Sequence, residues 1–177
     1  MPWKIITIEG NSFNFYNQDM NVECGPACAA MIAQAMNKGI SISGSRQIVR
    51  RVERTQGGFN QDWNLDYTND MKSLVQVLCS RGIRNAMYNT PANTDRYLNN
   101  LRSAGFKKPA ILRVYDPYGH FVICVGESST KGSFHIIDPE LPNGHVLLTI
   151  VPGNPKLAYN RTGVWYYLDL VRMITTN

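Results

Sequence analysis

The stretch that decides the fold is QDMNVECGPAC, residues 18–28. From Cys24 onward the chain is apolar on almost every helical face, which predicts a buried helix that ends before Gly39. Pro26 fits the first turn of this helix, because the N–H group that proline lacks would have no partner there. The stretch therefore places a cysteine at the N-terminus of a central helix, six residues after the glutamine at position 18.

A cysteine in this position suits nucleophilic chemistry. The unpaired N–H groups and the macrodipole at a helix N-terminus favour negative charge, and the thiolate is the reactive form of cysteine. Gly25 leaves space beside the sulfur of Cys24. The side-chain amide of Gln18 and the backbone N–H of Cys24 are candidate donors to an oxyanion on a substrate carbonyl. The structural alternatives are a core cysteine and a solvated loop glutamine.

Two later segments supply a candidate base and a candidate carboxylate. HFVICV predicts a buried strand that opens with His120, and FHIID predicts a strand that ends at Asp138. If these strands form a hairpin, the two side chains lie at the same end, and the carboxylate can fix the tautomer of the imidazole. His135 faces the opposite way and is excluded, and His145 is a distant second choice as base. The alternatives are a structural histidine and an aspartate that forms a turn.

The order of the predicted elements indicates an α+β fold in which residues 1–177 form one domain, with helices first and antiparallel strands second. Besides the helix at Cys24, the predicted helices are 41–54, one capped by Thr68 and closed by Gly82, and one capped by Thr94 and closed by Gly105. A loop is predicted at 56–65, anchored by Phe59 and Trp63. The predicted strands are 3–8, 110–115, 120–126, 133–138, 145–151 and 163–168. We expect the site in the seam between the helices and the strands.

Composition excludes several classes of protein. The net charge is +5, but the basic residues are scattered and form no face for nucleic acid. No apolar run has the length of a secretory signal or a membrane span, so we expect a cytoplasmic protein or one secreted without a cleaved signal peptide. The four cysteines are expected as thiols rather than disulfides. Cys24, Cys28 and His120 are the candidate ligands for zinc, but the usual paired-ligand spacings are missing, and we expect no metal and no cofactor.

In Gln18 with CGPAC, in HFVICVG and in IIDP, the chain resembles the bacteriocin-processing (double-glycine leader) peptidase family of the papain clan. The resemblance implies a papain-like cysteine peptidase with Cys24 as nucleophile, His120 as base, Asp138 as the orienting residue and Gln18 in the oxyanion hole. Members that trim peptide leaders are commonly fused to a membrane transporter, a region this sequence lacks. Glu23 stands where an aspartate often precedes the cysteine.

The sequence therefore predicts a thiol-dependent hydrolase that cleaves peptide bonds in a protein or peptide through a thioester acyl-enzyme. Two alternatives stay open. Stand-alone domains of this kind also resemble bacterial secreted effectors and toxins, in which the same triad would act as a deamidase, amidase or acyl transferase. Such an effector would have a cognate inhibitor or immunity protein as partner. The second alternative is a non-catalytic binding module on the same fold.

Overall fold

The computed structural model describes residues 3–18, 24–38, 44, 67–115, 119–150 and 157–177. Its elements are β1 (Trp3–Ile8), β2 (Asn11–Tyr16), α1 (Cys24–Ala35), α3 (Tyr67–Ser80), β3 (Met87–Asn89), α4 (Thr94–Ser103), β4 (Ala110–Tyr115), β5 (His120–Glu127), β6 (Phe134–Ile137), β7 (His145–Ile150), β8 (Leu157–Arg161) and β9 (Val164–Thr175). Apart from Gly44, the helix predicted at 41–54 and the loop predicted at 56–65 lie outside the described residues. Among the described residues, no helix combines the length and hydropathy needed to cross a membrane.

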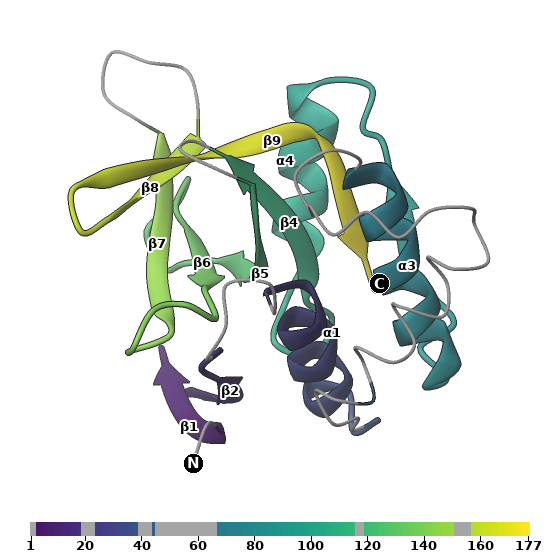
Figure 1. The fold of residues 1–177 in the computed structure, drawn as a ribbon. Helices are drawn as coiled ribbons and strands as arrows, with labels where there is room; N and C mark the ends of the chain where they lie inside the picture. The colour runs from purple at the N-terminus through teal and green to yellow at the C-terminus, as the bar shows by residue number, and fades with distance from the viewer. Residues whose placement is uncertain (1–2, 19–23, 39–43, 45–66, 116–118, 151–156) are drawn as a thin grey trace.

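In the described part of the chain, the main sheet has seven strands in the order β3-β9-β4-β5-β6-β7-β8. The pairings shown for its strands are antiparallel, and β9 pairs with β8 as well as with β4. The strands from β4 to β9 therefore form a closed circuit of pairings, with β9 as the long yellow strand that bridges its two ends (Figure 1). The strand β9 continues to Thr175, beyond the predicted end at 168, because its second half runs beside β4 and β3.

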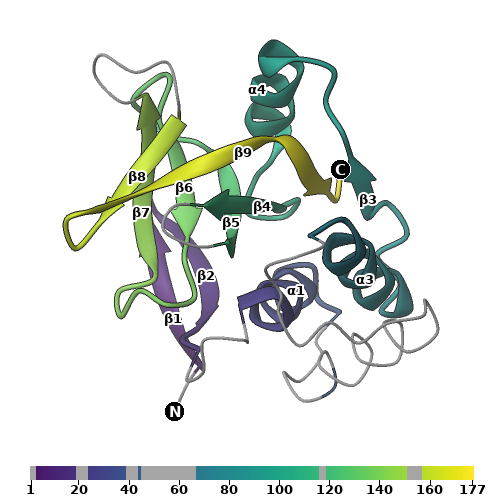
Figure 2. The same ribbon diagram turned by 45° about the horizontal axis from the view of Figure 1, so that its top comes forward.

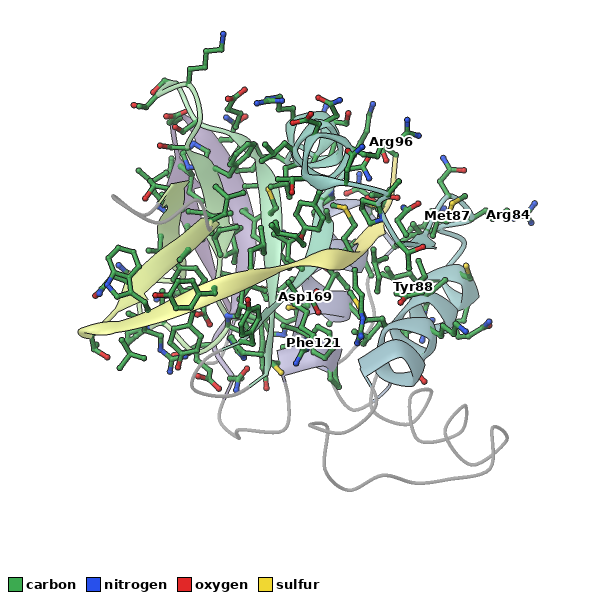
Figure 3. The ribbon with its side chains drawn as sticks, turned by 90° about the horizontal axis from the view of Figure 1, so that it is seen from above. Arg84, Met87, Tyr88, Arg96, Phe121 and Asp169 are labelled. Atoms are coloured by element: carbon green, nitrogen blue, oxygen red, sulfur yellow. The ribbon has the colours of Figure 1, made fainter. Side chains whose placement is uncertain are left out.

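The sheet separates two hydrophobic clusters. α1 and α3 pack against each other on one side, while α4 packs against β5 and β9 on the other (Figures 1 and 2). Alternate residues of β5 divide between the clusters: Phe121 and Ile123 face α1, whereas Val122 and Cys124 face α4. Phe121 is labelled beside α1 in Figure 3. The period-two interpretation of this strand is confirmed, and its first residue lies where α1 begins.

The N-terminal hairpin is only half predicted. β1 matches the predicted strand 3–8, but β2 was not predicted, and this hairpin precedes the first helix. Phe13, Phe15 and Tyr16 of β2 pack in the hydrophobic cluster that contains α1. This packing fixes the position of the chain just before Gln18. The short strand β3 and the strand β8 were also missed.

The predicted caps need correction. Thr68 lies inside α3, which begins at Tyr67, although Gly82 follows the helix with φ +80° as predicted for a closing glycine. α4 is capped by Asn93 rather than by Thr94. The extended backbone of Asn93 lets its side chain accept a hydrogen bond from the backbone N–H of Arg96 at 2.9 Å.

Candidate functional site

Cys24 is the first residue of α1, as the sequence predicts. α1 packs on β5, and one turn into the helix the Cys28 thiol donates a hydrogen bond to the backbone carbonyl of Phe121 at 3.5 Å. Cys28 is fully buried, whereas Cys24 retains 7% of its surface exposed. The helix thus places one thiol at its tip, at the edge of solvent, and seals the next thiol inside.

His120 is the first residue of β5, and its ring is brought to Cys24. Nε2 of the ring lies 2.7 Å from Oδ1 of Asp138, and the ring also forms a hydrogen bond with the Cys24 side chain. The antiparallel pairing of β5 with β6 produces the first contact, because it sets the start of β5 beside the end of β6. The structure therefore brings together the thiol, the imidazole and the carboxylate from three separate elements.

The electrostatics of this cluster favour a charged imidazole. Burial alone lowers the pKa of His120, but the negative charge of Asp138, its hydrogen bond and the hydrogen bond to Cys24 together raise that pKa to about 10. Burial raises the pKa of the Asp138 carboxyl, yet the His120 charge and the hydrogen bonds to the carboxylate outweigh burial and hold this pKa below its ordinary value. The pair is therefore an imidazolium and a carboxylate at neutral pH.

Asp138 is held by more than His120. Oδ1 accepts a hydrogen bond from the backbone N–H of Glu140 at 2.9 Å, and Oδ2 accepts one from the hydroxyl of Tyr159 at 2.8 Å. The carboxylate itself is fully buried, and a buried charge of this kind is stable only when it is well hydrogen-bonded. These bonds fix the carboxylate, which in turn fixes the ring of His120.

Gln18 lies two residues after the end of β2 and beside the segment after β6. Its backbone N–H donates to the carbonyl of Pro139 at 2.8 Å, and the side chain of Asn17 donates to the same carbonyl at 2.9 Å. The Gln18 side chain donates from Nε2 to Oε1 of Glu140 at 3.1 Å. Gln18 is thus joined to the segment that carries Asp138.

The other two histidines form a separate cluster. Nδ1 of His135 lies 2.9 Å from Nε2 of His145, and Nε2 of His135 lies 3.2 Å from Glu9 in the β1–β2 turn. His145, the second choice as base, therefore contacts a histidine and not Asp138. Within the described part of the chain, no group of three His, Cys, Asp or Glu side chains is arranged to hold a metal ion.

Sequence reasoning missed Tyr159, Glu140 and Arg161. The guanidinium of Arg161 forms an ion pair with Glu140 and lies 3.9 Å from Oδ2 of Asp138. Tyr159 and Arg161 belong to β8, which was not predicted, so no signal pointed to them. Glu140 could have been found, because it follows Asp138 by two residues at the end of a strand.

No protein-family model matches the sequence, and comparison with curated proteins found no similar sequence. Solved structures do match. One is a double glycine motif protease from an AMS/PCAT transporter in complex with the leader peptide, with 18% identity, coverage of 97% of this chain and 91% of that chain, and a TM-score of 0.50. Another is the peptidase domain of Streptococcus ComA, a bi-functional ABC transporter involved in a quorum sensing pathway, with 15% identity, coverage of 93% and 96%, and a TM-score of 0.52. Likeness at these identities establishes the fold: this chain has the papain-like fold of the double-glycine peptidase domains.

Proposed function

We propose that this protein is a cysteine peptidase in which Cys24, His120 and Asp138 form a catalytic triad and Gln18 contributes to the oxyanion hole. One observation supports this proposal most strongly: a single buried imidazole contacts both the Cys24 side chain at a helix N-terminus and the Asp138 carboxylate. The peptidase fold of the solved relatives supports the same reaction class. The proposed substrate is an extended peptide segment.

The proposed reaction proceeds through a thioester. The Cys24 sulfur attacks the scissile carbonyl carbon, and the backbone N–H of Cys24 and the Gln18 amide stabilise the oxyanion. The imidazolium of His120 donates its proton to the departing amine as the C–N bond breaks. Neutral His120 then accepts a proton from water, whose oxygen attacks the thioester. The C–S bond breaks, the acid leaves, and the Cys24 sulfur is again beside the His120 imidazolium. Asp138 holds the ring in the orientation that both proton transfers need.

The first test is the reactivity of Cys24. Iodoacetamide at mildly acidic pH is expected to alkylate Cys24 selectively, because its sulfur lies at a helix N-terminus, retains some exposure to solvent and contacts the charged ring of His120. Burial raises the pKa of the Cys28 thiol well above its ordinary value and that of Cys124 to about 12, so neither should compete. Cys79 is half-buried, and a Cys79→Ala background removes this competitor. Equal labelling of Cys24 and Cys79 in the wild type would contradict the proposal, and so would an unreactive Cys24 in the Cys79→Ala background.

The second test is turnover. Cys24→Ala should retain the fold, checked by thermal unfolding, and lose all cleavage of peptide libraries analysed by mass spectrometry. Residual cleavage by this variant would overturn the mechanism. Proteins that stay intact but carry deamidated or acylated side chains would instead identify a deamidase or acyl transferase that uses the same triad. A wild-type protein whose Cys24 is unreactive would be a binding module.

A further inference from the structure

Residues 138–140, the segment that follows β6, contact both halves of the proposed site. Asp138 holds His120, and the carbonyl of Pro139 accepts the backbone N–H of Gln18. Glu140 then accepts the side-chain amide of Gln18 at 3.1 Å. One short segment thus contacts His120, the proposed base, and both the backbone and the side chain of Gln18, the proposed oxyanion donor.

We propose that Glu140 is a positioning residue that orients the Gln18 amide for oxyanion stabilisation, and that Arg161 supports it. This inference rests on the proposed peptidase function and assigns Glu140 no contact with substrate. The observation that carries it is the chain of contacts from Arg161 to Glu140 to Nε2 of Gln18.

The chemistry of the two side chains explains why a carboxylate is suited to this role. A carboxamide has a donor end and an acceptor end of similar shape, whereas an ionised carboxylate only accepts. Glu140 therefore specifies that the NH2 end of Gln18 faces the segment beside His120. An amide nitrogen carries two N–H groups, so one can be engaged by Glu140 while the other donates to a substrate oxygen. With a neutral amide at position 140, Gln18 could pair equally well in the flipped orientation.

A carboxylate bonded to an oxyanion donor would ordinarily oppose negative charge on the substrate, and the positive charge of Arg161 offsets this repulsion. The side chains of Glu140 and Arg161 are only 12% and 19% exposed, so their charges are partly shielded from water and act on each other. Oε1 of Glu140 also lies 3.8 Å from Nδ1 of His120. Both cations therefore offset the charge of Glu140, which can hold Gln18 without adding net negative charge to the site.

Two reactions with small reagents separate positioning of Gln18 from the state of the Cys24–His120 pair. Acylation by p-nitrophenyl acetate passes through an oxyanion: the Cys24 sulfur bonds to the acetyl carbon and p-nitrophenolate leaves. Alkylation by iodoacetamide displaces iodide from a saturated carbon and forms no oxyanion. Both rates are measured on Cys24→Ala as background and on wild type, Gln18→Ala, Glu140→Gln and the double variant, with thermal unfolding of each. Asp95→Asn, an exposed carboxylate on α4, is the matched control.

Gln18→Ala should slow acylation by up to about 10²–10³-fold, the usual cost of losing one oxyanion donor. Glu140→Gln should slow it less, by about 10-fold, because the donor is present but not held in one orientation. Neither substitution should change the alkylation rate at pH 7, because Asp138 and Cys24 raise the pKa of His120 to about 10 and keep its ring charged without Glu140. Asp95→Asn should change neither rate. In the Gln18→Ala background, Glu140→Gln should have no further effect, because its target is gone. If Glu140→Gln unfolds, Glu140→Asp, which withdraws the carboxylate, should show the same selective loss.

Three results would overturn the inference while the peptidase proposal stands. The first is an unchanged acylation rate in Glu140→Gln, and the second is additive losses in the double variant. The third is a loss of alkylation in Glu140→Gln equal to its loss of acylation, which would mean that Glu140 acts on the Cys24–His120 pair. Failure of wild-type Cys24 to react with either reagent would instead overturn the proposed function, and the inference with it.

Discussion

At the scale of single residues, Asp138 links the proposed triad to the side chains packed around it. Its carboxylate is fully buried and is satisfied by His120, by the backbone of Glu140 and by the hydroxyl of Tyr159. The ring of Tyr159 stacks on Tyr166 at 5.5 Å, and Tyr166 in turn lies edge-on to His120. The aromatic pair therefore helps to enclose the charged pair.

Removal of the Tyr159 hydroxyl tests this arrangement. Tyr159→Phe deletes a hydrogen bond to a buried carboxylate and should lower the free energy of unfolding by about 1.5–3 kcal/mol. The matched control is Tyr97→Phe. Tyr97 is also fully buried, but its hydroxyl has no hydrogen-bond partner within the described part of the chain. Its removal should be neutral or stabilising. Urea unfolding of both variants checks the prediction, and equal losses would contradict it.

At the scale of elements, the site depends on how the N-terminal hairpin meets the turn between β6 and β7. Gly144 ends this turn with φ +78°, and its carbonyl accepts the backbone N–H of Asp138 at 3.0 Å. A Cβ at this position would lie 2.8 Å from the ring of Phe15, which is fully buried in β2. The turn therefore closes over the hairpin only because residue 144 has no side chain.

Gly144→Ala should be strongly destabilising for two separable reasons. The left-handed backbone costs about 1–2 kcal/mol with a side chain, and overpacking against a fixed ring adds about 1–3 kcal/mol. Gly132→Ala is the control: Gly132 has φ +84°, but apart from its two chain neighbours no described residue has an atom within 4 Å of the place that a Cβ would occupy. The difference between the two losses, measured by thermal or urea unfolding, should equal the cost of overpacking. Equal losses would mean that Phe15 yields freely.

At the scale of the whole molecule, the buried charge pair makes stability depend on pH. The pKa of His120 is about 10 in the folded protein against an ordinary value of 6.5, so its stabilisation is complete below 6.5 and is lost as pH rises through about 10. Asp138 has a pKa below its ordinary 3.8, so its contribution is complete above 3.8 and is lost as pH falls. The pair therefore stabilises the fold most between 3.8 and 6.5.

A comparison with His120→Gln isolates the histidine contribution. Glutamine is neutral at every pH, so the difference in melting temperature between wild type and variant should be largest near pH 6 and should shrink steadily toward pH 10. The difference cancels the titration of groups that both proteins share. A difference that stays constant over this range would contradict the elevated pKa of His120.

Peptide cleavage by the wild type should also fall as pH approaches 10, because His120 then lacks the proton for the departing amine.

The sequence alone indicated the helix at Cys24, the strand from His120 and the strand that ends at Asp138, because each is a local pattern of apolar residues with a polar residue at one end. It also placed His120 and Asp138 at the same end of a hairpin, because antiparallel pairing of neighbouring strands leaves little choice. The roles assigned to these residues and to Gln18 stay predictions.

Only the tertiary structure decided what surrounds them. β8, a strand with no clear sequence pattern, pairs with its chain neighbours β7 and β9. It brings the hydroxyl of Tyr159 to Asp138, 21 residues earlier in the sequence. The contact between Glu140 and Gln18 spans 122 residues of sequence and depends on how the hairpin packs against the sheet. Such contacts arise from the packing of whole elements, and a local pattern carries no information about which elements will meet.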